Sequence, residues 1–221
     1  MNRILVIDKP SGMTSHDVVD VVRKKLNIRK VGHCGTLDPM ATGVLVILTN
    51  KATKRQAELS FDEKEYVSTM VLGSATDSHD STGKTTHEAS TENINDALIH
   101  EVLNSFKGKQ KQIPPMVSAK HYKGKRLYKL AREGIVVERE PVDIEIRELE
   151  ILKIDKDEVR FRVVCSKGTY IRTLCDDIGK KLGCFAHMKA LRRTRSGNFL
   201  IDDAIKLESI ESSIEDEDSK A

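Results

Sequence analysis

Residues 31–48 constrain this chain more than any other stretch. They place three glycines, one proline, one histidine and a single carboxylate, Asp38, ahead of the apolar run 44–48. Glycine permits backbone conformations that other residues avoid, and Pro39 favours an extended Asp38 followed by a turn. The pattern predicts a loop that holds one acid in a fixed position before a core strand. An isolated Asp-Pro pair is also an ordinary turn former, so the rest of the chain must decide between the two readings.

The length and composition indicate one main globular domain. The chain has 221 residues, of which 38% are hydrophobic and 32% charged. No apolar run approaches the roughly 20 residues that a membrane-spanning helix needs, and the N-terminal apolar run is too short for a secretory signal. We therefore expect a cytoplasmic protein that does not act on membranes. The four cysteines form no Cys-x-x-Cys pair and are expected to be reduced, buried thiols.

Charge is distributed unevenly along the chain. The net charge is +3, but residues 202–221 carry a balance of −6. Residues 107–132 hold nine lysines and arginines and no acid, with Tyr122 and Tyr128 among them. Such a segment suits a polyanion, most simply a nucleic acid. A solvated basic face without a partner is the alternative.

Apolar periodicity predicts strands alternating irregularly with helices. Strands are expected at 4–8, 44–48, 66–72, 142–151 with a bulge or break, 159–165 and 186–194. Helices are expected at 16–26 with Ser15 as the N-cap, at 53–59, from Glu92 to Gly108, at 125–133, at 171–182 ended by Gly183, and over Ala204, Leu207 and Ile210. Residues 73–84 are expected to form a loop. Because the strict alternation of a parallel sheet is missing, the expected class is α+β, with a mixed, largely antiparallel sheet and flanking helices.

Several kinds of catalytic site are excluded by spacing. Residues 83–85 end like a phosphate-binding loop, but the required glycine five places earlier is Ser78. Asp77, His79, Asp80 and His87 match neither a calcium loop nor a zinc motif. A lone carboxylate can still act as a nucleophile or a base. The remaining candidates are rearrangement of a glycosidic bond and RNA binding without catalysis.

The loop sequence is part of a longer resemblance. Residues 32–45, Gly-His-Cys-Gly-Thr-Leu-Asp-Pro-Met-Ala-Thr-Gly-Val-Leu, resemble the signature of the TruB-type tRNA pseudouridine synthases. Further segments resemble this family in the family's order, at 8–15, 52–54, 64–66, 113–119, 166–172 and 191–193. The resemblance covers roughly residues 3–200, and seven ordered motifs make it specific.

The resemblance implies the pseudouridine synthase catalytic fold and a defined reaction. These enzymes isomerise uridine 55 in the T-loop of tRNA by breaking the N1–C1′ bond, turning the uracil and rejoining it through C5. They use no cofactor and no metal. Asp38 matches the catalytic nucleophile, although the sequence leaves open whether it attacks C1′, adds to the base or removes a ribose proton. The target base must leave its stack to be reached.

Five further residues match substrate-binding positions of the family. By resemblance, Tyr66 stacks on the flipped base, and Arg172 pairs with the catalytic carboxylate, which keeps it ionised and oriented. Tyr170 and Leu191 match positions that line the uracil pocket, and His33 matches the histidine that supports base flipping. Three of these residues also have a structural reading: Tyr66 as a core tyrosine, Arg172 as a surface arginine and Leu191 as plain core.

The resemblance also implies a domain organisation and partners. We assign residues 1–207 to the catalytic domain and 208–221 to an acidic, disordered tail. A C-terminal PUA domain, usual in the family, is expected to be missing, and Asn50 stands where a glycine is usual. The expected partner is the T-arm of tRNA. We expect no membrane association and no obligatory protein partner, and we expect the chain to be a monomer.

Two other functions stay open at this point. One is a non-catalytic protein of the same fold that binds or folds tRNA. The other is modification of ribosomal RNA within a guide-RNA particle, as in the dyskerin-type relatives. Substituting Asp38 tests the first alternative, and an assay with unmodified tRNA and no guide RNA tests the second.

Overall fold

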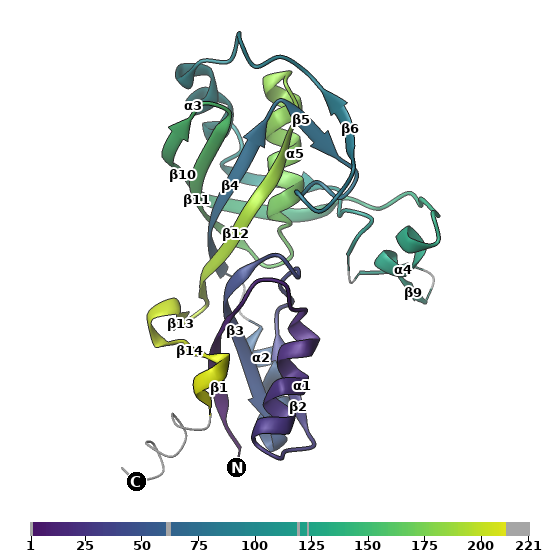
Figure 1. Ribbon diagram of the computed structural model, residues 1–221, viewed down its shortest axis with the longest axis vertical. Helices are drawn as coiled ribbons and strands as arrows, with labels where there is room; N and C mark the ends of the chain where they lie inside the picture. The colour runs from purple at the N-terminus through teal and green to yellow at the C-terminus, as the bar shows by residue number, and fades with distance from the viewer. Residues whose placement is uncertain (1, 61–62, 119, 123, 211–221) are drawn as a thin grey trace. The chain divides into compact units, whose positions relative to one another are not determined.

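The computed structural model describes residues 2–60, 63–118, 120–122 and 124–210 (Figure 1). The chain forms two compact units: unit 1 comprises residues 1–67 and 191–221, and unit 2 comprises residues 68–190. Strands β4 (Glu63–Leu72) and β12 (Ala186–Ser196) contribute residues to both units. Each unit is described by itself.

Unit 1 is built on strand β3, whose two edges are both paired. Antiparallel β1 covers one edge, with Ile4 opposite Leu48 and Lys9 opposite Gly43. The other edge pairs first with β12, in parallel, and then with antiparallel β2. The elements belonging wholly to unit 1 are β1 (Ile4–Lys9), α1 (Ser15–Lys25), β2 (Val31–Cys34), β3 (Thr42–Thr49), η1 (Asn50–Arg55), α2 (Gln56–Leu59), β13 (Phe199–Leu200), η2 (Ile201–Asp203), β14 (Ile205–Lys206) and η3 (Leu207–Ser209).

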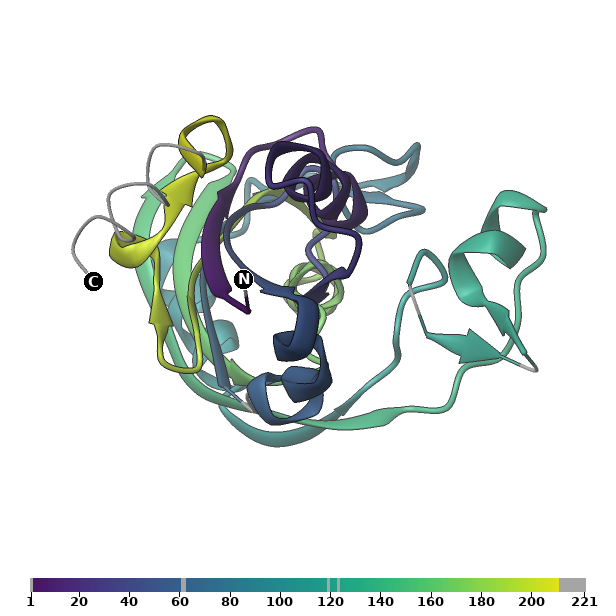
Figure 2. The ribbon, with the colours of Figure 1, turned by 90° about the horizontal axis from the view of Figure 1, so that it is seen from below.

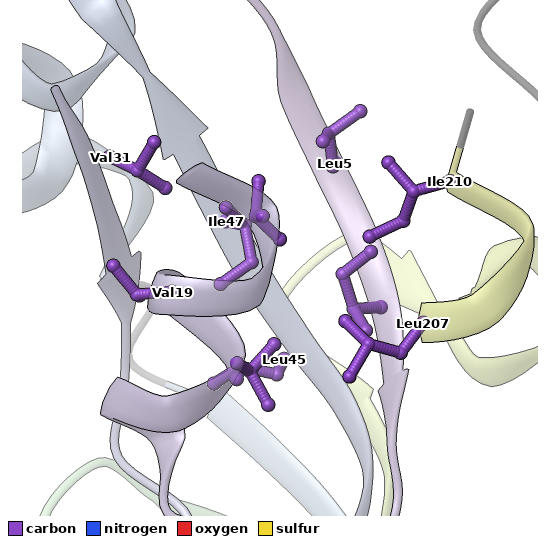
Figure 3. Close-up of a cluster of buried hydrophobic side chains, with 10 residues drawn as sticks. Leu5, Val19, Val31, Leu45, Ile47, Leu207 and Ile210 are labelled. Atoms are coloured by element: carbon purple, nitrogen blue, oxygen red, sulfur yellow. The ribbon is translucent and has the colours of Figure 1, made fainter. Parts of the chain in front are cut away.

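The core of unit 1 lies on both faces of β3. Leu45 and Ile47 pack on one face with β1, α1 and the C-terminal segment, as Figure 3 shows. Val44, Val46 and Leu48 point to the opposite face and pack with Cys34, Ala52 and Leu59. Since alternate side chains of a strand point to opposite faces, a continuous apolar run fits a strand buried on both sides. The predicted core strand at 44–48 is confirmed.

Helix α1 begins one residue earlier than predicted. Thr14, not Ser15, is the N-cap: its hydroxyl accepts from the Asp17 backbone N–H at 3.0 Å, and the Asp17 carboxylate accepts from the Thr14 N–H at 2.7 Å. This reciprocal capping box satisfies two backbone donors at once. Ser15 is thereby free to use its hydroxyl elsewhere, and it hydrogen-bonds the backbone of Leu37.

The predicted C-terminal helix over Ala204, Leu207 and Ile210 is wrong in the described part of the chain. Ile205 instead pairs in parallel with Ile7 of β1. Leu207 and Ile210 then reach the core of unit 1 through a short 3₁₀ turn. Three-residue spacing fits a 3₁₀ turn as well as it fits an α-helix, so periodicity could not distinguish them. Most of the predicted acidic tail, residues 211–221, lies outside the described residues.

Unit 2 combines helices with a sheet in which β7, β10 and β11 are antiparallel. Strand β4 neighbours β11, β11 neighbours β10, and β10 neighbours β7. The elements wholly in unit 2 are β5 (Ser74–Thr76), β6 (Thr85–Glu88), α3 (Asp96–Asn104), β7 (Gly108–Gln112), β8 (His121–Tyr122), β9 (Lys125–Arg126), α4 (Leu127–Arg132), β10 (Val142–Asp155), β11 (Glu158–Ser166) and α5 (Ile171–Leu182). The segment with β8, β9 and α4 lies to one side of this sheet (Figure 2).

Helix α5 and the bulge in β10 follow the prediction. Helix α5 spans Ile171–Leu182 and ends at Gly183, whose φ of +80° suits glycine. The pairing of β10 with β11 shifts register between Ile146 and Glu148. An extra residue of this kind changes which parity faces inward, as the apolar positions on either side of it require.

Three other local predictions for unit 2 need correction. Helix α3 starts at Asp96 rather than near Glu92, because the Asn95 side chain caps it by accepting from the Leu98 N–H at 2.9 Å. Residues 73–84 are not all loop, since β5 pairs with β6 in a small hairpin. The helix predicted at 125–133 is shortened to α4, because Lys125 and Arg126 form β9 opposite β8.

The described residues confirm the predicted class. The sheets mix antiparallel pairs with parallel ones such as β1–β14 and β3–β12, and the helices flank them. Cys34, Cys165, Cys175 and Cys184 are buried free thiols, as expected. Among the helices described, none is long and apolar enough to cross a membrane.

Candidate active site

Asp38 lies in the loop that joins β2 to β3, and hydrogen bonds fix the loop on both sides of it. The Ser15 hydroxyl binds both polar backbone groups of Leu37, accepting from its N–H at 2.9 Å and donating to its C=O at 3.2 Å. After Asp38, the Pro39 carbonyl accepts from the Gly12 N–H at 2.9 Å. A turn closes from the Asp38 carbonyl to the Ala41 N–H at 3.0 Å. The backbone that carries the carboxylate is therefore held from residue 37 to residue 41.

Lys9 anchors the same loop from β1. Its side chain is fully buried, and its ammonium donates to the carbonyls of Pro10 at 2.8 Å, Met13 at 2.6 Å and Pro39 at 3.1 Å. An ammonium has three N–H donors, and these bonds use all of them. Lys9 thus ties residues 10–13 to the residue that follows Asp38.

The charge of Lys9 lies close to that of Asp38. Burial lowers the pKa of Lys9 to about 8, while the negative charges of Asp38 and then Asp17 oppose that shift. Burial disfavours the ammonium and a nearby carboxylate favours it. Lys9 is therefore a cation near neutral pH that becomes neutral in mildly alkaline solution.

Arg193 of β12 holds the base of the loop. The side chain is 1% exposed. Its Nε donates to the Val44 carbonyl at 2.7 Å and its Nη2 to the Gly35 carbonyl at 3.0 Å. One guanidinium therefore bonds to the first residue of the loop and to the start of β3.

Lys64 of β4 brings a third buried cation to this region. It is 7% exposed, and its Cε would lie 3.8 Å from a Cβ added to Gly35. Its positive charge acts on Cys34, whose pKa is nevertheless raised because burial is the larger effect. The loop of Asp38 is thus bordered by the buried cations Lys9, Lys64 and Arg193.

These three cations were not assigned roles from the sequence, although a signal was present. Lys9 follows Leu5 and Ile7 at the inward parity of β1. Lys64 precedes Tyr66 and Ser68 at the inward parity of β4. A charged residue at an inward-facing strand position is uncommon without a partner, so strand parity alone could have identified Lys9 and Lys64.

The other predicted site residues of unit 1 lie on strands next to this loop. His33 is in β2 rather than in an irregular loop; burial, and after it the charge of Arg193, lowers the His33 pKa. Its buried Nδ1 has no hydrogen-bond partner among the described residues. Tyr66 is 8% exposed on β4, and Leu191 begins the unit 1 part of β12, where its carbonyl lies 3.5 Å from the Thr42 hydroxyl.

Tyr170 is held by a buried glutamine of unit 2. It is the N-cap residue of α5, and both backbone polar groups of Tyr170 bond to the amide of Gln112. The Tyr170 N–H donates to Gln112 Oε1 at 2.8 Å, and Gln112 Nε2 donates to the Tyr170 carbonyl at 3.1 Å. Gln112 is 3% exposed. The start of α5 is therefore fixed to the end of β7.

Arg172 lies in a buried charge cluster, not on the helix surface. It is 3% exposed, donates to the Val117 carbonyl, and lies with Nη1 3.8 Å from Asp80 Oδ2. Asp80 is 4% exposed and also accepts from the hydroxyls of Ser78 at 2.7 Å and Thr82 at 2.5 Å. Asp80 is therefore buried beside Arg172, where its carboxylate can orient the guanidinium.

The predicted site residues thus form two groups. Asp38, His33, Tyr66 and Leu191 belong to unit 1, whereas Tyr170 and Arg172 belong to unit 2. Within unit 1, Asp38, His33 and Leu191 are on or beside elements that pair with β3.

The basic segment 107–132 differs from the loop of Asp38 in its exposure. Lys109, Lys111 and Lys125 are exposed. Arg132 lies over the ring of Tyr128, with 5.5 Å between its Cζ and the ring centroid.

Within the described ranges, no group of three or more His, Cys, Asp and Glu side chains could hold a metal ion.

Two protein-family models match the chain. The N-terminal domain of TruB family pseudouridylate synthases matches residues 23–171, and the C-terminal domain of tRNA pseudouridylate synthase B matches residues 172–221. The tRNA pseudouridine synthase B of Alkaliphilus oremlandii is 51% identical, over 96% of this chain and 70% of that protein. That of Endomicrobium trichonymphae is 48% identical, over 95% of this chain and 91% of that protein.

Solved structures agree with the family match. A chain in a Cbf5-Nop10-Gar1 complex is 35% identical with a TM-score of 0.75, and a chain in an H/ACA RNP bound to a substrate RNA is 33% identical with a TM-score of 0.70. Both matches cover 95% of this chain, which spans about half of each solved chain, 53% and 52%. With a family model over residues 23–171 and relatives near 50% identity, the chain belongs to the TruB family of pseudouridylate synthases.

Proposed function

We propose that this chain isomerises uridine 55 in the T-loop of tRNA to pseudouridine, with Asp38 as the catalytic nucleophile. The observation that carries the proposal is the loop of Asp38, which is fixed on both sides of a single carboxylate in a TruB family chain. Relatives at 48–51% identity bear the name tRNA pseudouridine synthase B, which supports tRNA as the substrate.

The reaction needs one well-placed nucleophile and no external reagent. The N1–C1′ bond of uridine breaks and a C5–C1′ bond forms. C5 loses its hydrogen as a proton and N1 gains one, so substrate and product are isomers. A carboxylate can act as the nucleophile or base for such steps, and its rate advantage depends on holding the reacting groups in position.

Hydrogen bonds to Leu37 and Pro39 supply that positioning at Asp38. They leave the backbone little freedom on either side of the carboxylate. A misplacement of about 1 Å can lower an enzymatic rate roughly 100-fold. The chemistry proposed here therefore depends on the loop as much as on the carboxylate itself.

The remaining roles follow the resemblance and stay proposals. Tyr66 would stack on the flipped uracil, Arg172 would pair with the Asp38 carboxylate, and Tyr170 and Leu191 would line the base pocket. For His33, the buried Nδ1 without a partner in the described residues supports a contact with RNA. Segment 107–132 would bind tRNA phosphates, which position a substrate without reading its sequence. A monomeric state and a cytoplasmic location also remain predictions.

The test is a release assay with the purified 221-residue chain. Unmodified tRNA transcript carries tritium at C5 of its uridines, and no guide RNA is added. The proposal predicts release of one tritium equivalent per tRNA, and none from a transcript with cytidine at position 55. Release that persists from the cytidine transcript would contradict the position, and binding without any release would favour a non-catalytic tRNA-binding protein.

The same assay separates a second candidate, guide-dependent modification. The likeness to chains of Cbf5-containing particles favours considering it. Those particles contain other components according to their names, and this chain spans about half of the matching chain in the Cbf5-Nop10-Gar1 complex. Release that required an added guide RNA would support this candidate over action on free tRNA.

A further inference from the structure

The base of the loop of Asp38 coincides with a fork in the sheet of unit 1. On the edge of β3 opposite β1, Gly43 pairs with Arg193 of β12, and Val46 pairs with Cys34 of β2. The two partner strands therefore diverge at Val44. A backbone carbonyl at such a point needs a donor from elsewhere, because an unsatisfied buried carbonyl is costly.

The Arg193 side chain supplies that donor and also links β3 to the end of β2. Its Nε donates to the Val44 carbonyl at 2.7 Å, and its Nη2 donates to the carbonyl of Gly35, the residue after β2, at 3.0 Å. The backbone of Arg193 pairs with Gly43 at the same time. One residue thus bonds to β3 through its backbone and to both ends of the loop through its guanidinium.

The packing around this guanidinium is close. A Cβ added to Gly35 would lie 3.4 Å from Arg193 Nη1, and a Cβ added to Gly43 would lie 2.2 Å from the Arg193 carbonyl oxygen. The two glycines therefore allow the arginine and the ends of the loop to approach each other. The position of Arg193 leaves the loop base little room to shift.

We propose that Arg193 is a positioning residue for catalysis: its guanidinium clamps Gly35 to Val44 and so sets where the loop carries the Asp38 carboxylate. This proposal rests on the function proposed above. Arg193 acts through the loop backbone and is not assigned a contact with the substrate.

The charge of Arg193 also reaches the groups on either side of the loop. It contributes to lowering the pKa of His33 and, less than burial does, that of Lys9. The arginine side chain is a cation in proteins, so Arg193 adds a positive charge to the surroundings of the Asp38 loop.

The shape of the guanidinium, and not only its charge, is what the clamp uses. Arginine presents several N–H groups in a rigid planar fork, whereas a lysine ammonium is a compact point charge on a flexible stem. Arg193→Lys keeps the charge but cannot bond Gly35 and Val44 from one rigid group. Arg193→Met removes both the charge and the bonds.

The test measures kcat and KM of both variants in the tritium-release assay, together with tRNA affinity and thermal stability. We expect kcat to fall about 100-fold for Arg193→Met and about 10-fold for Arg193→Lys. KM and tRNA affinity should stay within about threefold of wild type. Arg195→Met is the matched control, since Arg195 lies on the same strand but pairs with Glu63 at 2.7 Å; its kcat should remain within about twofold.

Rates are calculated per molecule that binds tRNA and are measured well below the melting temperature of each variant. A merely structural role would reduce the fraction that binds, but it would leave kcat per binding-competent molecule unchanged. If Arg193→Lys folds and keeps the wild-type kcat, the inference is wrong even when Arg193→Met fails to fold. If the wild-type chain releases no tritium, the proposed function itself fails, which is a different result.

Discussion

The loop of Asp38 and the basic segment 107–132 both depend on positive charge but use it differently. Beside the loop, Lys9 and Arg193 are buried, and the N–H groups donate to backbone carbonyls. In the basic segment, Lys109 and Lys111 are exposed on the strand β7. Buried cations fix the backbone where geometry must be held, whereas exposed cations leave their charge available to a polyanion.

The difference between the two regions also predicts how large the effects of substitutions are. Leaving buried polar groups unsatisfied costs about 1–3 kcal/mol each. Exposed charges contribute about 0–1 kcal/mol to folding, although they can dominate binding to a nucleic acid. We therefore expect changes at the loop to alter stability and kcat, and changes in the basic segment to alter KM and its dependence on salt.

The largest effect on stability is expected from Gly43→Ala. Gly43 has a φ of +99°, and an added Cβ would lie 2.2 Å from the carbonyl oxygen of Arg193. Left-handed backbone costs a non-glycine residue about 1–2 kcal/mol, and overpacking costs about 1–3 kcal/mol more. Urea unfolding should show a loss of about 3 kcal/mol, with loss of activity in the folded fraction.

Gly12→Ala is the control for that variant. Gly12 also has a positive φ, +87°, but nothing lies within 4 Å of its added Cβ. It should lose only the backbone term, about 1–2 kcal/mol. Equal losses for the two variants would contradict the close approach of β12 to the loop base.

Lys9→Met should have the next largest effect. The substitution removes the Lys9 donor from the carbonyls of Pro10 and Met13 and leaves the Pro39 carbonyl with the Gly12 N–H alone, while it removes the cost of burying a charge. We expect a net loss of about 2 kcal/mol by urea unfolding. Lys24→Met, at an exposed position of α1, should change stability by less than about 0.5 kcal/mol. A Lys9→Met chain as stable as wild type would show that these bonds do not hold the loop.

The pH dependence tests the same lysine in the intact chain. The pKa of Lys9 is about 8 in the fold, against a usual value of 10.5. Above pH 8 the folded chain loses this proton before the unfolded chain does, so this group's contribution to stability rises between pH 8 and 10.5. A neutral amine has one N–H fewer than the ammonium, however, and cannot bond all three carbonyls, so kcat should fall above about pH 8.

Lys9→Arg separates that titration from others in the reaction. A guanidinium stays protonated over the whole range. Its kcat at pH 7 is expected to be lower than that of wild type, because its shape differs, but the fall above pH 8 should disappear. An unchanged alkaline fall in Lys9→Arg would assign the titration to another group.

The smallest effect on the folded chain is expected in the basic segment. Replacing Lys109 and Lys111 with Gln should leave stability and kcat unchanged while KM for tRNA rises several-fold. Each lost phosphate contact lowers the slope of log affinity against log salt by about 0.7–0.9, so the slope should fall by about 1–2. Lys24→Gln with Lys30→Gln removes the same charge from exposed sites of unit 1. Equal effects of the two pairs would mean that net charge, not the segment, attracts tRNA.

The sequence was informative where one local rule decided the structure. The end of α5 at Gly183 and the bulge in β10 followed from a glycine and a change of parity. The expected terminal helix failed because its spacing also suits a strand followed by a 3₁₀ turn. The strand that forms instead, β14, pairs with β1, and local periodicity does not predict pairing between segments that are distant in the sequence.

For the candidate site, the sequence predicted a catalytic residue but not the contacts that hold its loop. Asp38 was identified from its own loop and from the resemblance. Lys9 and Arg193 lay within segments quoted for the resemblance, but their burial depends on β3 and on the carbonyls of residues 35, 39 and 44. These contacts join residues that are 30 to 158 positions apart in the sequence. Strand parity could have identified the inward direction of these side chains, but not their partners.

The most direct test of the account is the activity of Asp38→Asn on free tRNA. The amide has nearly the shape of the carboxylate but is not a nucleophile, and the hydrogen bonds to Leu37 and Pro39 involve other groups. We predict that single-turnover tritium release falls at least about 1000-fold, while the Kd for tRNA changes by less than about threefold. Release by Asp38→Asn at the wild-type rate would contradict the assignment of Asp38 as the catalyst.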